Sequence, residues 1–204
     1  MPERVILPEY CIYDQNTSIG KDALLKMCRE KGIECDRVAN VKSTKRACEI
    51  LAELLLVNEA FGPEAELCHN ENGAPYIKNN PADISISHSR YIVCLAVSLS
   101  KTIGIDVEFN SEKIVRVRSR FLSSRELLFI PEDDLELNNR AWCAKESIYK
   151  AASIEGVDIR KDIVINDDNI SSGTLNYNGL TMQFKIKHHS LGQYTVTVAS
   201  VITR

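Results

Sequence analysis

The sequence predicts an α+β fold, because its helical and strand-forming segments occur in blocks rather than in strict alternation. Two segments, 43–62 and 138–153, carry apolar residues at helical spacing. Each is followed by short β-branched runs that turn residues separate, which is typical of antiparallel strands. Since no Ser- or Gly-rich linker interrupts the chain, we expect two closely packed subdomains, 1–101 and 102–204.

The composition is that of an ordinary globular protein. The chain has 204 residues, of which 44% are hydrophobic and 26% charged, and its net charge is −3. This balance argues against disorder and against a nucleic-acid-binding protein, which would normally be basic. No segment approaches about 18 consecutive apolar residues, so we expect a cytoplasmic protein that does not enter a membrane. Seven scattered cysteines without a C-x-x-C pair disfavour a disulfide framework and a zinc site.

The first half begins with a predicted strand at 4–7 and a predicted helix at 20–32, which ends at its glycine. The second helix, 43–62, opens with Ser43 or Thr44 as its N-cap. Its apolar stripe consists of Ala47, Ile50, Leu51, Leu54 and Leu55.

The remaining strands are predicted from apolar runs that turn residues interrupt. In the first half these runs lie within 65–89, 91–100 and 101–109. In the second half they follow the helix at 138–153 and occupy 162–167, 172–177, 180–188 and 193–202. Asn178-Gly179 joins two of these runs and is typical of a hairpin turn.

Two acidic residues interrupt the apolar run "IGIDVEFN" at 103–110. Residues i and i+2 of a strand face the same side, so Asp106 and Glu108 project together, while Ile105 and Val107 face the buried side. Two carboxylates on one face repel each other, and an interior site tolerates them only with a cation or several donors between them. A solvated D-x-E strand edge is the alternative interpretation.

The segment "WCAKESIYKA" at 142–151 adds a third carboxylate and two lysines. On a helix, Trp142, Glu146 and Lys150 lie on one stripe, with Lys145 beside it. If this stripe faces the strand, Glu146 completes a set of three carboxylates, which suits Mg²⁺. Lysines beside such a site indicate a substrate with a pyrophosphate. A surface ion pair between Glu146 and Lys150 is the alternative.

A third fragment, "ISISHS" at 84–89, ends in polar residues. We expect Ile84 and Ile86 to face inward and Ser85 and Ser87 to face outward, with His88 at the strand end. Hydroxyls, backbone amides and an imidazole at a strand end can form an anion site. A structural hydrogen bond of the histidine is the alternative.

Together these fragments resemble the 4'-phosphopantetheinyl transferases, specifically their monomeric surfactin-type group. The resemblance covers about residues 70 to 152. It rests on "NGAPYI" at 72–77, "ISISHS" at 84–89, "IGIDVE" at 103–108, "RFLSSRE" at 120–126 and "WCAKESIYKA" at 142–151, in the family's order. It implies a monomer built from two similar α+β subdomains related by a pseudo-twofold axis.

The resemblance also implies an activity. The enzyme would move 4'-phosphopantetheine from coenzyme A to a serine hydroxyl of an acyl or peptidyl carrier protein, as holo-acyl-carrier-protein synthases do in fatty acid or secondary metabolite biosynthesis. It would release adenosine 3',5'-bisphosphate. A catalytically idle module that binds coenzyme A or the carrier, and a Mg²⁺-dependent pyrophosphate hydrolase, are the alternatives.

Residue roles follow from the same resemblance. Asp106, Glu108 and Glu146 would bind Mg²⁺, or Mn²⁺ in its place. Lys145 and Lys150 would hold the pyrophosphate, and Glu146 would take the serine proton directly or through a water. The other residues implied to bind coenzyme A are Arg46, Gly73, Pro75, Ser87 and His88, the last two at its 3'-phosphate.

Two features depart from the family pattern. A lysine commonly stands between the glycine and the proline of the first motif, where this chain has Ala74. The helix that usually adds basic residues carries Lys45 and Arg46 at its start but Glu49 and Glu53 inside it.

The expected carrier-binding surface is basic, because carrier proteins are acidic around the modified serine. The segment "KIVRVRSR" at 113–120 is the best candidate, and a solvated helix face is the alternative interpretation.

Overall fold

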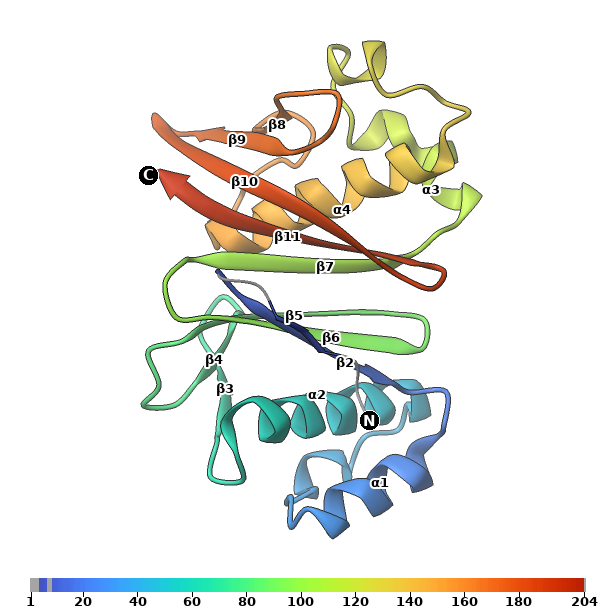
Figure 1. Ribbon diagram of the computed structural model, residues 1–204, viewed down its shortest axis with the longest axis vertical. Helices are drawn as coiled ribbons and strands as arrows, with labels where there is room; N and C mark the ends of the chain where they lie inside the picture. The colour runs from blue at the N-terminus through green and yellow to red at the C-terminus, as the bar shows by residue number, and fades with distance from the viewer. Residues whose placement is uncertain (1–3, 7–8, 204) are drawn as a thin grey trace. The chain divides into compact units, whose positions relative to one another are not determined.

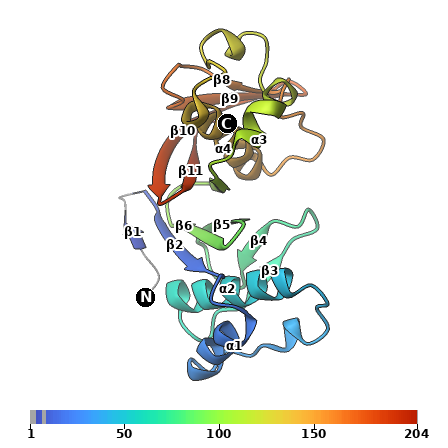
Figure 2. The same ribbon diagram turned by 90° about the vertical axis from the view of Figure 1, so that its right-hand side faces the viewer.

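The computed structural model describes residues 4–6 and 9–203, and the chain separates into two compact units, Met1–Ser100 and Lys101–Arg204. Each unit combines helices with an antiparallel sheet, so the predicted α+β class is confirmed (Figures 1 and 2). The strand predicted at 4–7 is found at Arg4–Ile6, and Leu7 lies outside the described residues. No helix in the described part of the chain is long and apolar enough to cross a membrane.

In its described residues, unit 1 forms a sheet in the order β1-β2-β6-β5 and a separate β3-β4 hairpin, with α2 between the sheet and α1. Its elements are β1 (Arg4–Ile6), β2 (Cys11–Asn16), α1 (Lys21–Glu30), the 3-10 helix η1 (Asp36–Val38), α2 (Thr44–Phe61), β3 (Leu67–His69), β4 (Pro75–Ile77), β5 (Asp83–Ser89) and β6 (Ile92–Ser98).

Helix α2 is buried on two sides, so its apolar residues occupy more of the helix surface than one stripe would cover. Its N-cap is Ser43, whose hydroxyl accepts a hydrogen bond from the backbone N–H of Arg46 at 3.3 Å. Leu51 and Leu55 pack toward α1, whereas Leu56 and Val57 pack toward the sheet. The polar residues that share these buried positions therefore need partners of their own.

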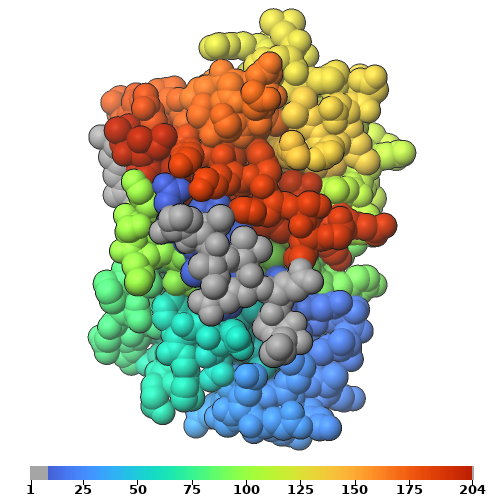
Figure 3. Space-filling view, viewed as in Figure 1, coloured from blue at the N-terminus to red at the C-terminus, as the bar shows by residue number. Residues whose placement is uncertain are grey.

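Unit 2 is built around a five-stranded antiparallel sheet in the order β7-β11-β10-β9-β8, with α4 across one face (Figures 1 and 2). Its elements are β7 (Ile103–Phe109), α3 (Glu112–Val117), η2 (Arg118–Arg120), η3 (Glu126–Leu128), α4 (Leu135–Ala152), β8 (Ile163–Ile165), β9 (Ser172–Tyr177), β10 (Leu180–Leu191) and β11 (Tyr194–Thr203). In the space-filling view, β10 and β11 form much of the visible surface of this unit (Figure 3).

Helix α4 begins three residues before the predicted start at 138. Asp134 is its N-cap and accepts from the backbone N–H of Leu137 at 2.8 Å. Asn138 and Asn139 then lie inside the first turns, where their side-chain amides donate back to preceding carbonyls. Two asparagines that look like a boundary in the sequence are thus satisfied within the helix.

Candidate active site

The backbones of β7 and α4 come into direct contact at Gly104. A Cβ atom at this position would lie 2.1 Å from the carbonyl oxygen of Ser147 and 2.6 Å from the backbone nitrogen of Ala151. Only a residue without a side chain fits there. The glycine of "IGIDVE" therefore sets the distance between the strand and the helix that carry the acidic residues.

Gly104→Ala is expected to reduce the free energy of unfolding by about 3 kcal/mol, because a helix backbone cannot yield as a side chain can. Gly173→Ala is the matched control. Its Cβ would meet mainly Cδ1 of Ile148, at 2.4 Å, the movable end of a side chain. Urea unfolding of both variants checks this, and equal losses of stability would contradict the explanation.

The carboxylates of β7 face α4, whose stripe of polar residues supplies their partners. Lys150 Nζ lies 2.8 Å from Oδ1 of Asp106 and donates to the carbonyl of Ile105 at 3.0 Å. Trp142 Nε1 donates to Oε1 of Glu108 at 3.3 Å. Asp106 is only 5% exposed. In the structure, β7 and α4 bring these side chains together.

Ile105 and Val107 lie on the other side of β7 and are fully buried, as the strand alternation predicted. Trp142 is held by an edge-to-face contact with Phe121, with ring centroids 5.0 Å apart. Phe121 belongs to the "RFLSSRE" motif, so this motif supports the residue that contacts Glu108.

Glu146 occupies the same stripe as Trp142 and Lys150, one helical turn from each. Burial and the negative charges of Asp106 and Glu108 raise the pKa of Glu146 to about 7, although Lys150 opposes the shift. Three carboxylates thus interact with one another beside the ammonium group of Lys150.

This excess of negative charge is chemically suited to a divalent cation with oxygen ligands. Among the residues that the structure describes, no three acidic, histidine or cysteine side chains already have the spacing of a metal site. The ammonium of Lys150 instead contacts Asp106. The donor chemistry of Asp106, Glu108 and Glu146 fits Mg²⁺, and the contacts of Asp106 and Glu108 described above are with protein donors.

Lys145 does not join this cluster. Its side chain is fully buried, its Nζ lies 2.9 Å from Oε2 of the equally buried Glu126, and it donates to the carbonyls of Ile159 and Ile163 at 3.2 and 2.7 Å. Burial lowers the pKa of Lys145, and Glu126 opposes that shift. The ammonium therefore joins α4 to η3, to the segment before β8 and to the first residue of β8.

Glu126 is a buried polar residue of unit 2 that sequence reasoning missed. Its Oε2 accepts from the backbone N–H of Ser123 at 2.7 Å, and its Oε1 accepts from Ile165 at 2.8 Å. In return, its own N–H donates to the Ser123 hydroxyl at 3.3 Å, which completes a capping box. The S-x-x-E spacing in "RFLSSRE" was the available signal, whereas the pairing with Lys145 had none.

In unit 1, the predicted residues Arg46 and His88 converge on buried carboxylates of α2. Glu49 Oε1 lies 3.4 Å from His88 Nδ1 and 3.6 Å from Lys45 Nζ. Arg46 Nη1 bridges Glu49 Oε2 at 3.2 Å and Glu53 Oε1 at 3.0 Å. Burial lowers the pKa of Arg46, but the two carboxylates outweigh it and leave this pKa raised. We call these five residues the Glu49 cluster.

The other predicted residues of unit 1 lie elsewhere. Ser85 and Ser87, expected to face outward, are 5% and 6% exposed, and this expectation was wrong because both faces of β5 are covered there. Ser87 and His88 point to opposite sides of the strand. Gly73 and Pro75 belong to the β3-β4 hairpin, where Gly73 has φ of 78° in the connecting turn.

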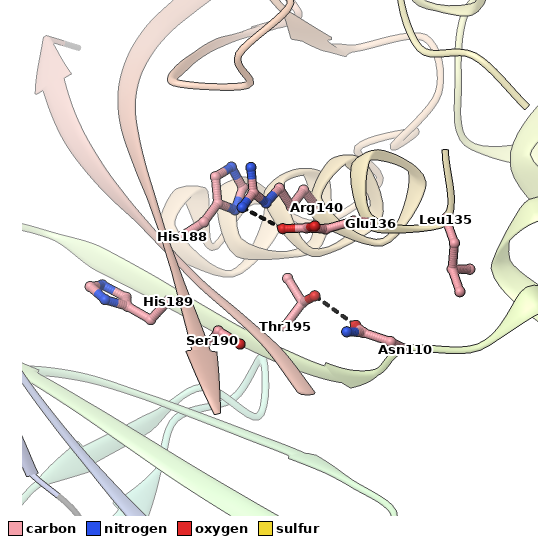
Figure 4. A pocket seen from close by; sticks show the side chains of 8 residues that line it. All are labelled: Asn110, Leu135, Glu136, Arg140, His188, His189, Ser190 and Thr195. Atoms are coloured by element: carbon pink, nitrogen blue, oxygen red, sulfur yellow. Dashed lines mark hydrogen bonds and ion pairs between the residues drawn. The ribbon is translucent and has the colours of Figure 1, made fainter. Parts of the chain in front are cut away.

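A cavity of about 300 Å³ lies beside the N-terminal half of α4 (Figure 4). It is lined by Asn110, Leu135, Glu136, Arg140, His188, His189, Ser190 and Thr195.

His188 is held in place, because its Nε2–H donates to the carbonyl of Ile170 at 2.9 Å and its Nδ1 accepts from the Thr197 hydroxyl at 2.8 Å. The pKa of His188 is lowered to about 4, mainly because the ring is largely buried. The hydrogen bond to the carbonyl of Ile170 opposes this shift, whereas the positive charge of Arg140 adds to it.

His188 is expected to make stability depend on pH between about 6.5 and 4. Its pKa is lower in the folded than in the unfolded chain, so its contribution is complete above 6.5 and is lost as pH falls through 4. Since the ring is partly exposed, we expect a loss of about 1–2 kcal/mol. Urea unfolding at pH 7 and pH 4.5 should show this loss in the native sequence and in His69→Gln but not in His188→Gln, and an equal loss in all three would contradict it.

Comparison with known families adds one finding. The model of the 4'-phosphopantetheinyl transferase superfamily matches residues 102–199. This segment contains β7, α4 and the cluster of Asp106, Glu108, Glu146 and Lys150. No curated protein sequence matches the chain.

Proposed function

We propose that this protein transfers the 4'-phosphopantetheine group of coenzyme A to a serine hydroxyl of an acyl or peptidyl carrier protein. The family match of residues 102–199 supports phosphopantetheinyl transfer in general. The observation that carries the proposal is the convergence of Asp106, Glu146 and Lys150 inside the matched segment. A buried and a partly buried carboxylate beside the ammonium group of Lys150 are suited to chemistry on a pyrophosphate.

In this reaction the serine oxygen forms a bond to the phosphorus that carries pantetheine. The bond from that phosphorus to the bridging oxygen breaks, and adenosine 3',5'-bisphosphate leaves with this oxygen. The serine proton passes to the Glu146 carboxylate, directly or through a water. The protein contributes mainly orientation of the groups and stabilisation of the developing charge.

Asp106, Glu108 and Glu146 would hold the divalent cation, Mg²⁺ or in its place Mn²⁺. When bound, the cation supplies positive charge to the pyrophosphate oxygens. The repulsion between the carboxylates supports this assignment. Burial and the negative charges of Asp106 and Glu108 together raise the pKa of Glu146, and a cation between the three side chains would relieve this repulsion.

The two lysines receive different roles. Lys150, whose side chain is 29% exposed, contacts Asp106 and can present its charge to the pyrophosphate. For Lys145 we propose a positioning role, because its ammonium is enclosed with Glu126 and two carbonyls. Lys145 holds α4 in position, and this helix carries Glu146 at the next residue.

Unit 1 would contribute contacts to the adenosine end of coenzyme A. Arg46 and His88 are the proposed contacts to the 3'-phosphate, and their common neighbour Glu49 supports a shared location. Ser87, Gly73 and Pro75 are proposed to bind coenzyme A from the family pattern alone.

The carrier protein is proposed to dock on the basic segment at α3 and η2. Lys113, Arg116 and Arg120 are exposed there, whereas Arg118 turns inward and donates to Oδ1 of Asn138 at 3.0 Å. Three exposed cations suit the acidic surface of a carrier.

Charge reversal in the variant Lys113→Glu/Arg120→Glu is expected to raise KM for the carrier about tenfold at low salt, with the effect shrinking as salt is added. Steady-state kinetics at two salt concentrations measure this. Lys26→Glu/Arg29→Glu, on exposed positions of α1, makes the same change in net charge. An equal rise of KM in this control would contradict a localised docking surface.

The activity itself is tested by following the nucleotide released from coenzyme A with and without an apo carrier protein. The proposal expects adenosine 3',5'-bisphosphate only when the carrier is present. Equal release without carrier would identify a pyrophosphate hydrolase. Binding of coenzyme A without any release would identify an idle binding module.

A further inference from the structure

The cations of the Glu49 cluster already have anionic partners within unit 1. Glu49 contacts His88, Lys45 and Arg46 at 3.4, 3.6 and 3.2 Å, and Glu53 contacts Arg46 at 3.0 Å. A phosphate that approached Arg46 and His88 would therefore meet a carboxylate between them.

Glu49 and Glu53 cannot readily leave these positions. Each is only 5% exposed, and both belong to the part of α2 that packs between α1 and the sheet. Retracting Arg46 toward a ligand would also leave two buried carboxylates with fewer partners, which is costly.

The charge balance of the cluster leaves little attraction for a second anion. Lys45 and Arg46 contribute two positive charges, and Glu49 and Glu53 contribute two negative charges. These four charges sum to zero. A phosphate dianion would gain contacts to the cations but would be repelled by both carboxylates at short range.

We propose that Glu49 removes the requirement for the 3'-phosphate, so that the protein uses coenzyme A and nucleotides lacking this phosphate, such as 3'-dephospho-coenzyme A, with similar efficiency. Glu49 is then a specificity-determining residue that acts through Arg46 and His88. This inference rests on the proposed function, because it takes the Glu49 cluster as the surroundings of the 3'-phosphate.

The test compares kcat/KM for coenzyme A and for 3'-dephospho-coenzyme A with a saturating apo carrier protein. In the native sequence the ratio of the two values is expected to lie within about threefold of one. In Glu49→Gln the ratio is expected to rise about tenfold in favour of coenzyme A, the gain from one released charged contact. Glu59→Gln, on the same helix and paired with Lys31 at 3.9 Å, is the matched control and should keep the native ratio.

A native ratio above about 100 would overturn the proposal, as would an unchanged ratio in folded Glu49→Gln. A binding titration with adenosine 3',5'-bisphosphate and with adenosine 5'-monophosphate separates this result from a failure of the proposed function. Similar dissociation constants for the two nucleotides in a protein without turnover would refute the transferase, and with it the similar use of two substrates, while still showing a site that does not select for the 3'-phosphate. Strong preference for the bisphosphate would overturn the inference alone, and binding of neither would overturn both.

Discussion

Asp106→Asn is expected to reduce kcat/KM for coenzyme A by about 10³-fold, the loss typical when a group that organises charge in an active site is removed. The amide keeps the shape of the side chain but removes the negative charge that lies 2.8 Å from Lys150. The cluster then loses one of three proposed cation ligands and the partner that orients its lysine. Steady-state turnover with coenzyme A and an apo carrier measures the effect.

The fold should survive this change. Lys150 keeps its hydrogen bond to the carbonyl of Ile105, and its side chain is 29% exposed, so water can replace part of the lost contact. Glu136→Gln on α4 is the control for removal of a helix carboxylate outside the cluster. Native activity in folded Asp106→Asn would refute the metal assignment.

Lys145→Met is expected to lower the free energy of unfolding by about 3–5 kcal/mol, because it leaves the carboxylate of Glu126 buried without its ion-pair partner. Two carbonyls, of Ile159 and Ile163, lose their donor as well. Lys161→Met, at a lysine that is 79% exposed, serves as the control and should cost little. Urea unfolding measures both.

The same substitution separates positioning from ligand binding. Adding Glu126→Gln to Lys145→Met should recover part of the lost stability, since the amide removes the buried charge and its one oxygen can still accept from either Ser123 or Ile165. At a temperature where Lys145→Met is folded, KM for coenzyme A should change less than threefold. A tenfold higher KM with native stability would instead place Lys145 in contact with the pyrophosphate, as the sequence pattern implied.

The acidic strand and its helix could be predicted because each depends on a local repeat. The two-residue alternation of β7 puts Asp106 and Glu108 on one side, and the helical spacing of α4 aligns Glu146 with Lys150. Gly104 lies on the same side of β7 as Asp106 and Glu108. The need for a glycine at this position could not be predicted, because the contact with the backbone of Ser147 depends on how two elements far apart in the sequence pack together.

Other features depend on partners that no short pattern reveals. Lys145 is one position from Glu146, yet the helix turns it toward Glu126, which lies 19 residues earlier in the chain. Glu49 and Glu53 were visible as acidic interruptions of a helix, but their burial follows from packing α2 between two layers. Serines on β5 were expected to face outward because alternation predicts sides and does not predict what covers them.

The measurement that tests the central claim most directly is the intact mass of an apo carrier protein after incubation with this protein and coenzyme A, with Mg²⁺ or with a chelator. The account predicts a gain of one phosphopantetheine on the carrier that requires Mg²⁺, the carrier serine and Asp106. An unchanged carrier mass across fatty-acid, polyketide and peptide-synthetase carriers, with folded protein that binds coenzyme A, would contradict it.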